Sequence, residues 1–505
     1  MSRLIRIHES DNVAVAAEDV AAGAEAHVGA KALRVSTDVP AGHKVALTDL
    51  TVGAAVVKYG FPIGHLTEAV HAGDWIHSHN LSTALSDNVQ YEFQGAPSVS
   101  ADGNKGTLAF MGYRRKNGRV GTRNEIWIIN TVGCVNHAAE RIAKLAADRF
   151  AARANERFAN RIDGVHSFSH PYGCSQLGDD LKNTQRVLAG MLRHPNVGGV
   201  LVLGLGCENN QMQSLLAAAG DIDQSRLRFF NTQEVIDEIE TGLDAVDELV
   251  VAMENDERVE CPVSDLIIGM KCGGSDGFSG ISANPLVGRI ADRLTSFGGG
   301  AILTEVPEMF GAEQVLMARA ENKAVFDAIG HMIDEFKEYF RSHDQPIYEN
   351  PSPGNKQGGL TTLEEKSLGA IQKGGRATVT SVLDYGELAP TRGLSLLQSP
   401  GNDGVSSTAM VASGATMLLF TTGRGTPLGF PVPTVKISSN TAIAEKKPHW
   451  IDFNAGELLD GTADIEQLAD RLFAFILDVA SGRAQTNNEK HGYREIAIWK
   501  EGVTL

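Results

Sequence analysis

Short runs of alternating apolar and polar residues fill the first 83 positions of the chain. "LIRIHE" (4–9), "NVAVAA" (12–17) and "HKVALTDL" (43–50) are separated by breaks that contain glycine or polar residues. Alternation with a period of two is typical of half-buried strands, and closely spaced turns are typical of all-β domains. We therefore predict a small all-β domain over residues 1–83. The polar, irregular residues 84–111 that follow are predicted to form a linker.

From residue 112 the pattern changes to apolar runs of strand length, each followed by a stretch with helical spacing. "NEIWIINTVGC" (124–134), "VGGVLVLGLGC" (197–207) and "DLIIGMKCGG" (265–274) are three such runs. Strands that alternate with helices predict βαβ units around a parallel sheet. The chain is thus expected to be a multidomain α/β protein, with a central α/β domain over residues 112–260 and a C-terminal α/β domain over residues 261–505.

Four of the five cysteines come directly after predicted strands. They are Cys134, Cys174, Cys207 and Cys272. Ligands of open α/β sheets bind outside the carboxyl ends of the strands, near helix N-termini. We therefore expect these cysteines to line one crevice. An odd number of cysteines does not indicate a disulfide framework, so packing, catalysis and metal binding remain their alternative roles.

The segment "KCGGSDGFSG" (271–280) concentrates reactive groups on a glycine-rich backbone. Glycine lets the backbone turn sharply and approach a ligand, while Cys272, Ser275 and Asp276 supply functional groups. A tight turn with a buried thiol is the alternative interpretation. Other strand ends also carry polar groups, namely His170, Tyr172 and Cys174 in one, Cys207, Glu208 and Asn209 in the next, and Glu305 and Glu308 in a third.

Two histidines stand close together in the small domain. His77 and His79 are two positions apart, so on a strand both rings would point to one face, as a pair of metal ligands requires. A solvated turn is the alternative. His43 and Lys44 offer further cationic groups in the same domain.

Two loops of the C-terminal domain have the chemistry to bind a sugar acid. "TTGRGTPLG" places Arg424 between glycines, a geometry suited to gripping a carboxylate with two hydrogen bonds. "SPGNDGVSST" (399–408), which contains Asn402 and Asp403, offers polar groups to sugar hydroxyls, or is a plain surface turn.

Composition and charge narrow the choice of function. Hydrophobic residues make up 42% of the chain and charged residues 21%, as in ordinary globular proteins. A formal charge of −17 without a basic run argues against nucleic acids and anionic membranes as partners, so an anionic substrate needs cations gathered locally. No signal peptide and no run of eighteen apolar residues occur, so a cytoplasmic location is expected. "GLGCEN" lacks the third glycine of a dinucleotide fingerprint.

Motifs along nearly the whole chain resemble the altronate and galactarate dehydratase family. They include "TVGCVN", "SHPYGCSQLGDD", "GLGCENNQ", "CGGSDGFSGISANP", "TEVPEMFGAEQ", "NPSPGNKQGGLTTLEEKSLG" and "TTGRGTPLGFPVPTVKI". "HSHN" and "HDQPIYENPSPGNK" resemble the altronate branch most closely. The resemblance implies an N-terminal SAF (β-clip) domain, a Rossmann-like sheet in the C-terminal domain and dependence on Fe²⁺.

The resemblance also implies a hydro-lyase of hexuronate catabolism that converts D-altronate to 2-dehydro-3-deoxy-D-gluconate. A base removes the C2 proton, the C3 hydroxyl leaves, and a metal stabilises the enediolate. Dehydration of another sugar acid such as galactarate, and binding of a sugar acid without catalysis, remain alternatives. An iron–sulfur cluster on the cysteines, or another divalent metal such as Mn²⁺, is the alternative to mononuclear iron. A small sugar acid and a second copy in a homodimer are the expected partners.

Roles follow as hypotheses from this resemblance and the motif chemistry. His170 is the proposed base, His77 and His79 are proposed to hold iron, and Arg424 and Lys44 to grip the substrate carboxylate. The predicted catalytic residues are His170, Cys174, Lys271 and Asp276, the predicted substrate-binding residues are His43, Lys44, Ser275, Asn402, Asp403 and Arg424, and the predicted metal ligands are His77, His79, Cys134, Cys207, Glu208 and Cys272.

Overall fold

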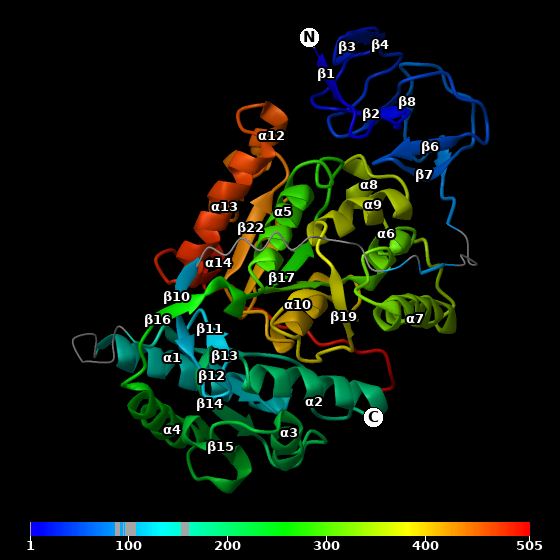
Figure 1. Ribbon diagram of the computed structural model, residues 1–505. Helices are drawn as coiled ribbons and strands as arrows, with labels where there is room; N and C mark the ends of the chain where they lie inside the picture. The colour runs from blue at the N-terminus through cyan, green and yellow to red at the C-terminus, as the bar shows by residue number, and fades with distance from the viewer. Residues whose placement is uncertain (1, 86–90, 94, 96–107, 153–160) are drawn as a thin grey trace.

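The small N-terminal domain is built only of strands and turns, as predicted. The computed structural model describes residues 2–85, 91–93, 95, 108–152 and 161–505 (Figure 1). β2 and β5 are buried along their whole length, and the other strands add single buried side chains to the core. One sheet has the order β4-β3-β1-β2-β5-β8 and a second has the order β6-β7-β9. The strands are β1 (Ser2–Ile5), β2 (Val13–Ala16), β3 (Glu25–Val28), β4 (Lys31–Arg34), β5 (Lys44–Ala46), β6 (Ala55–Lys58), β7 (Phe61–Leu66), β8 (Trp75–Ile76) and β9 (Leu81–Ser82).

A three-stranded antiparallel sheet follows, with the order β11-β10-β16. Its strands are β10 (Ala109–Arg114), β11 (Val120–Gly121) and β16 (Val259–Pro262). β10 starts inside the stretch predicted as a linker (84–111), most of which lies outside the described residues. β16 spans the predicted boundary at residues 260 and 261, so both α/β domains share this sheet. The predicted division into domains stays a prediction.

The central domain contains a parallel sheet of order β13-β12-β14-β15. Helices α1 and α4 pack on one face, and α2 and α3 on the other, where α2 also contacts α10 of the C-terminal domain. The strands are β12 (Glu125–Asn130), β13 (Gly164–Phe168), β14 (Val197–Gly204) and β15 (Leu227–Asn231), and the helices are α1 (Asn136–Ala152), α2 (Gly178–Leu192), α3 (Met212–Ala219) and α4 (Glu238–Met253).

The C-terminal domain is built on a larger parallel sheet, with the order β19-β20-β18-β17-β21-β22-β23. Its middle strands are buried on both faces, which explains their continuous apolar runs. The strands are β17 (Ile267–Cys272), β18 (Gly300–Leu303), β19 (Val379–Leu383), β20 (Gly393–Leu397), β21 (Met417–Thr422), β22 (Thr434–Ser438) and β23 (Phe453–Asn454). The two parallel sheets confirm the predicted multidomain α/β class.

Helices surround this sheet, and the domain lies between the small domain and the central domain (Figure 1). They are α5 (Ala283–Ser296), α6 (Glu313–Met317), α7 (Lys323–Ser342), α8 (Pro353–Gln357), α9 (Leu363–Ala370), α10 (Asp403–Ala412), α11 (Thr441–Lys446), α12 (Glu457–Asp460), α13 (Ile465–Ala480) and α14 (Asn487–His491). Among the described residues, no helix has the length and apolar character needed to cross a membrane.

Candidate active site

The glycine-rich loop after β17 is the surface on which the small domain docks. A Cβ atom on Gly277 would lie 1.9 Å from the carbonyl oxygen of Gly42, and one on Gly280 would lie 2.3 Å from the hydroxyl of Tyr59. Gly359, at φ +102°, packs against the same Gly42 oxygen. These glycines therefore allow two backbones to meet, whereas the sequence had suggested that they let the backbone approach a ligand.

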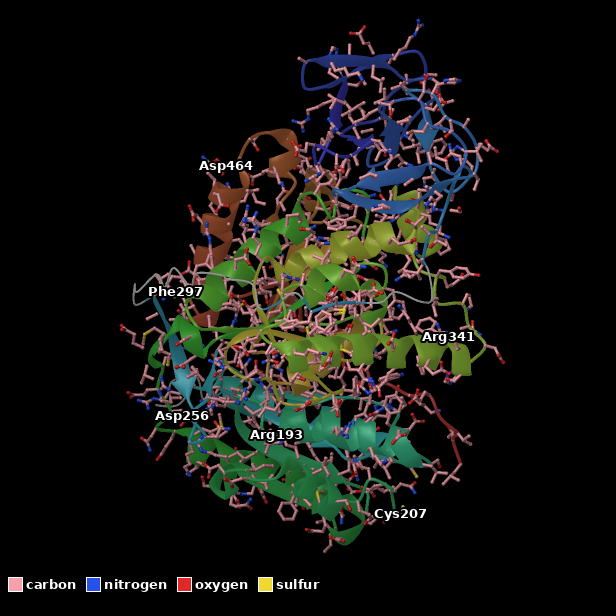
Figure 2. All side chains as sticks on the ribbon, turned by 45° about the vertical axis from the view of Figure 1, so that its right-hand side comes forward. Arg193, Cys207, Asp256, Phe297, Arg341 and Asp464 are labelled. Atoms are coloured by element: carbon pink, nitrogen blue, oxygen red, sulfur yellow. The ribbon has the colours of Figure 1, made fainter. Side chains whose placement is uncertain are left out.

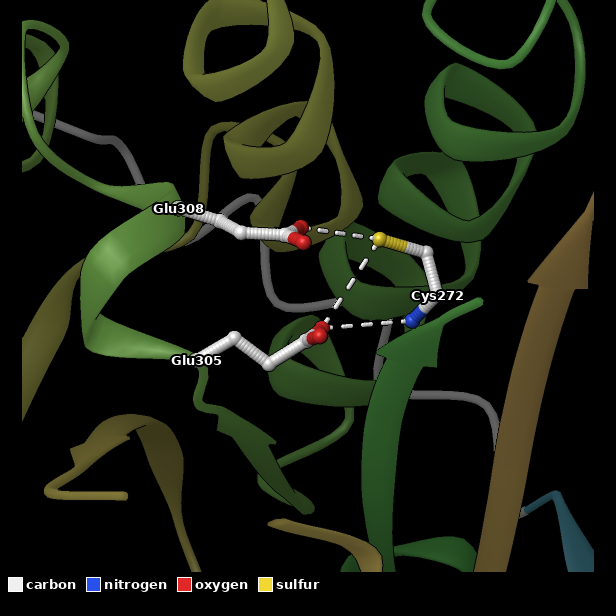
Figure 3. A group of neighbouring side chains, drawn as sticks. All are labelled: Cys272, Glu305 and Glu308. Atoms are coloured by element: carbon white, nitrogen blue, oxygen red, sulfur yellow. Dashed lines mark hydrogen bonds between the residues drawn. The ribbon is translucent and has the colours of Figure 1, made fainter. Parts of the chain in front are cut away.

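Cys272 and two glutamates meet at the carboxyl ends of neighbouring strands (Figure 3). Cys272 ends β17, while Glu305 and Glu308 follow β18 in a short 3₁₀ turn. The Cys272 sulfur lies 3.1 Å from Glu308 Oε2 and 3.7 Å from Glu305 Oε2, and the Cys272 N–H donates to Glu305 Oε2 at 3.3 Å. All three residues are buried. Within the described ranges, no other trio of metal-binding side chains brings its donor atoms within 4.8 Å of one another.

Three lysines surround this trio, two of them buried (Lys271 and Lys373) and one slightly exposed (Lys366). Lys373 Nζ lies 2.8 Å from the Cys272 sulfur, and Lys366 Nζ lies 2.9 Å from Glu308 Oε1. Lys271 Nζ contacts Glu305 and lies 2.8 Å from Asp403 Oδ1. Three ammonium groups therefore face the carboxylates of Glu305, Glu308 and Asp403. The three ammonium groups balance these three carboxylates, so the cluster gathers positive groups at one point without an excess of positive charge.

The surroundings shift the pKa values of the three residues in different directions. Burial, together with Glu305 and Glu308, raises the pKa of the Cys272 thiol to about 12. Burial and Glu308 raise the pKa of Glu305. Burial also opposes ionisation of Glu308, but the ammonium groups of Lys366 and Lys373 outweigh it and lower its pKa to about 2. Adjacent carboxyl groups with opposite shifts are typical of sites that transfer protons.

The trio has the donor types that a divalent iron or manganese ion takes. Two carboxylates and one sulfur converge from two strand ends. The ammonium groups of Lys366 and Lys373 contact these same donors and would have to move aside for a cation to bind. Cys272 was a predicted ligand, whereas Glu305 and Glu308 had been noted only as polar residues after a strand. The donor set fits the metal that the family resemblance implied.

Asp276 is an anchor of the loop in this structure. Its carboxylate accepts hydrogen bonds from the Ser279 N–H and hydroxyl and from the side chains of Ser439 and Asn440. These donors tie the glycine-rich loop to the end of β22, leaving the carboxylate enclosed. Ser275 lies beside it, and its carbonyl oxygen accepts from Asn355 Nδ2 at 2.8 Å. The structure thus gives no support for the predicted catalytic role of Asp276.

The predicted substrate-binding groups of the small domain bind the C-terminal domain instead. Lys44 donates to Glu365 at 2.9 Å and to the Gly359 carbonyl oxygen at 2.8 Å, and it is fully buried. His43 Nε2 lies 3.1 Å from the carbonyl oxygen of Gln357, while its Nδ1 accepts from Trp75. Both side chains are therefore already hydrogen-bonded across the interface between the two domains, as buried polar groups usually are.

His77 and His79 do not form a metal-binding pair on a strand. They follow β8 in a turn, and both rings pack against Trp75, at centroid distances of 5.3 and 5.1 Å. His77 Nε2 lies 2.8 Å from the Lys356 carbonyl oxygen, and burial lowers the pKa of His77 to about 4. This prediction is corrected to a docking role for His77.

His170 also has both ring nitrogens engaged. Its Nε2 lies 3.0 Å from the Asn130 carbonyl oxygen, and its Nδ1 accepts from the Tyr172 N–H. Burial lowers the pKa of His170, which favours the neutral ring that these two bonds require. No lone pair is left for a substrate proton, so the structure does not support His170 as the base.

The four strand-end cysteines divide between two sheets rather than lining one crevice. Cys134, Cys174 and Cys207 are exposed at the edge of the central sheet, whereas Cys272 is buried in the C-terminal domain. Glu208 is enclosed, because it accepts from the N–H groups of Leu205 and Gly206 and from the Thr131 hydroxyl. The predicted single set of ligands is therefore corrected to two separate groups. The Glu208 carboxylate holds the backbone of its own loop in place.

The remaining predicted groups lie at the C-terminal strand ends. Asp403 is 35% exposed beside Lys271, and Asn402 caps α10 by accepting from the Val405 N–H. Arg424 is exposed and donates to the Gly354 carbonyl oxygen at 2.9 Å. The predicted site residues did not include Lys366, Lys373 and Glu365, which follow no strand, although the motif "NPSPGNKQGGLTTLEEKSLG" contains Glu365 and Lys366.

Three family models together match nearly the whole chain. The Altronate/galactarate dehydratase SAF domain matches residues 2–84, the D-galactarate dehydratase/Altronate hydrolase second domain matches 112–254, and the D-galactarate/Altronate dehydratase C-terminal model matches 263–504. These matches coincide with the three structural parts described above.

Curated relatives align over almost their full length. The chain is 51% identical to the altronate dehydratase of Escherichia coli (strain K12), covering 99% of each chain, and 49% identical to that of Bacillus subtilis (strain 168), covering 100% of each. The galactarate dehydratase (L-threo-forming) of Escherichia coli (strain K12) is 34% identical, over 98% of this chain and 96% of its own.

Proposed function

The chain belongs to the altronate/galactarate dehydratase family, and from this premise we propose that it dehydrates D-altronate to 2-dehydro-3-deoxy-D-gluconate. The higher identity to altronate dehydratases than to the galactarate dehydratase favours altronate over galactarate. The observation that carries the proposal in the structure is the buried group of lysines and carboxylates around Cys272. It brings proton-transfer groups and three ammonium groups together at one point of the sheet.

The reaction sets two requirements for this site. The C2 proton is weakly acidic, so its removal needs stabilisation of the negative charge that spreads onto the substrate carboxylate. The C3 hydroxyl must also receive a proton as it leaves. The ammonium groups of Lys271, Lys366 and Lys373 act on this charge with little screening by bulk solvent, because Lys271 and Lys373 are buried and the Lys366 side chain is only 10% exposed.

We assign delivery of a proton to the departing C3 hydroxyl to Lys271 on geometric grounds, because its ammonium group can donate a proton but has no lone pair to remove the one at C2. Its Nζ joins the partly exposed carboxylate of Asp403 to the buried carboxylate of Glu305. A substrate that enters beside Asp403 therefore meets Lys271 before any deeper group. Arg424, exposed near α8, is positioned to hold the substrate carboxylate at the entrance.

Cys272, Glu305 and Glu308 are the residues that would hold a divalent metal, Fe²⁺ in this proposal, with Mn²⁺ as the alternative. When bound, such an ion supplies Lewis-acid stabilisation of the developing enediolate. Glu308, ionised beside Lys366, and the fixed backbone of Cys272 keep the donors in place. Lys373 lies 2.8 Å from the Cys272 sulfur and would have to move aside for that sulfur to serve as a metal donor.

An anaerobic assay of the purified protein tests this proposal. With Fe²⁺ added, D-altronate, galactarate, D-mannonate and D-glucarate are offered separately and 2-keto-3-deoxy products are measured. We expect selective turnover of D-altronate. Selective turnover of galactarate would move the chain to the other branch, and no turnover of any acid with metal demonstrably bound would favour the alternative of a non-catalytic sugar-acid binding protein.

A metal titration tests the assigned ligands separately from activity. Cys272→Ser and Glu308→Gln are expected to lower Mn²⁺ affinity at least about tenfold, since each removes one of few protein donors. Cys261→Ser is the matched control, because Cys261 is buried in β16, away from the trio. Equal affinity of all these proteins would exclude the Cys272 trio as the metal site.

The cytoplasmic location and the homodimer stay part of the proposal, and light scattering tests the dimer.

A further inference from the structure

Three exposed cysteines lie in the loops that follow three adjacent strands of the central sheet. β12 lies between β13 and β14, and Cys134, Cys174 and Cys207 follow these strands in the loops at their carboxyl ends. A glycine precedes each cysteine in the sequence. Figure 2 shows Cys207 at the end of the molecule that the central domain forms. Free cysteines are usually among the most buried residues, so three exposed thiols at one sheet edge need an explanation.

Hydrogen bonds hold the three loops against one another. The Gly133 N–H donates to the Tyr172 carbonyl oxygen at 2.9 Å, which joins the first two cysteine loops. The Asn210 N–H donates to the Gly173 carbonyl oxygen at 2.9 Å, which joins the second and third. A Cβ atom on Gly173 would lie 2.1 Å from the Thr131 carbonyl oxygen, so glycine is required for this close approach. The residues next to each cysteine are thus fixed relative to the other two loops.

Helix N-termini and a side-chain amide donor lie close to the three cysteines. α1 begins two residues after Cys134, and the N-termini of α2 and α3 follow the other two cysteines. Helix N-termini stabilise thiolates and other negative charge. Gln233 Nε2 also lies 3.6 Å from the Cys207 sulfur and donates a hydrogen bond to it. N–H donors to sulfur are a common means of tuning iron–sulfur centres.

We propose that Cys134, Cys174 and Cys207 bind an iron–sulfur cluster of the [4Fe–4S] class. In the described part of the chain only the Cys272 trio brings its donors within 4.8 Å of one another, so these three sulfurs are more widely spread than the ligands of one ion. A cluster spans such a spread, because irons and sulfides lie between its cysteine sulfurs. Three thiolates serve three of the four irons, which leaves the fourth open to a small exogenous ligand. This site is distinct from the metal site at Cys272 and does not depend on the dehydratase proposal.

Anaerobic reconstitution of the full-length protein with Fe²⁺ and sulfide tests the cluster. We expect about four acid-labile sulfides per chain and about four irons beyond the one assigned to the Cys272 trio, with a broad visible absorption. Cys134→Ser, Cys174→Ser and Cys207→Ser are each expected to lose most of the sulfide and the absorption. Cys261→Ser and Cys272→Ser are expected to retain both, because neither residue lies at this edge.

Alkylation followed by mass spectrometry gives a second measurement on the wild-type chain. Iodoacetamide should label Cys134, Cys174 and Cys207 in the metal-free protein and spare all three after reconstitution. The proposal would be overturned by iron without sulfide, by a disulfide between two of the three thiols, or by equal labelling of the three before and after reconstitution. Loss of the cluster in Cys272→Ser alone would overturn it too.

Discussion

Lys58 of the small domain and Glu365 of the C-terminal domain form a fully buried ion pair, with Nζ 2.7 Å from Oε1, although 307 positions separate them in the chain. Glu365 also accepts from Lys44 and from the Thr361 N–H and hydroxyl. These contacts lower the pKa of Glu365 against the effect of burial and raise the pKa of Lys58. The pair joins the small domain to the helix that carries Lys366.

Glu365→Gln is expected to release the small domain. The change leaves two buried ammonium groups without a carboxylate, which costs about 3–5 kcal/mol. Faster proteolytic cleavage between the small domain and the rest of the chain, and a lower Tm, would report it. Glu335→Gln, an exposed position on α7, is the control and should change stability by less than about 0.5 kcal/mol. Unchanged proteolysis of the Glu365 variant would show that the pair does not hold the domain.

Gly277→Ala is expected to disturb the same interface from its other side. The new Cβ atom meets the Gly42 carbonyl oxygen at 1.9 Å, so one backbone must move, at a cost of about 1–3 kcal/mol. We expect a lower kcat/KM and a lower Tm. Gly401→Ala is the matched control, since nothing lies within 4 Å of its added Cβ. Equal Tm values for both variants would contradict the close contact.

His194 is expected to make stability depend on pH. Burial lowers its pKa from 6.5 to about 4, and its ring stacks on Trp127 while Nε2 lies 3.0 Å from the Ala415 carbonyl oxygen. Below pH 6.5, His194 binds a proton in the unfolded chain but stays neutral in the folded chain. Stability is therefore fully present above about pH 6.5 and falls by about 3 kcal/mol as the pH approaches 4.

Urea unfolding at pH 7 and pH 5 measures this contribution. His194→Gln is expected to be less stable at both values but to lose less stability between them than the wild type does. His137→Gln, at an exposed histidine of α1, should leave the pH dependence unchanged. Identical pH slopes for the wild type and the His194 variant would contradict the buried neutral ring.

Lys271→Met is expected to lower kcat by about 10²–10⁴, as loss of a proton-transfer group does. Lys271→Arg keeps the positive charge and distinguishes proton transfer from charge balance between Glu305 and Asp403. Circular dichroism and Mn²⁺ binding show whether each variant keeps its fold and its metal. Lys323→Met, on the exposed face of α7, is the control. A kcat within about fivefold of the wild type in Lys271→Met would exclude the assigned role.

The strand-and-helix pattern predicted the fold class because burial of the parallel strands is a local property of each run. "DLIIGMKCGG" placed Cys272 at the end of a strand, and Glu305 and Glu308 followed the next, so the sequence indicated most of the trio. It did not indicate that Lys366 and Lys373 face the trio, since a lysine that points inward looks like an exposed one in sequence. His77, His170 and Lys44 have reactive side chains, and only the structure shows that backbone carbonyls and Glu365 already occupy them.

Because 307 positions separate Lys58 and Glu365, the small domain is synthesised well before its carboxylate partner. Domains generally fold as they emerge, from the N-terminus onward, so the small domain completes its sheets while Lys44 and Lys58 still face water. Their carboxylate partner leaves the ribosome only after the loop 271–280 and the trio around Cys272 have been made. Closure of the small domain is therefore a late step of maturation, and a chain arrested before residue 365 carries a finished domain with no place to dock.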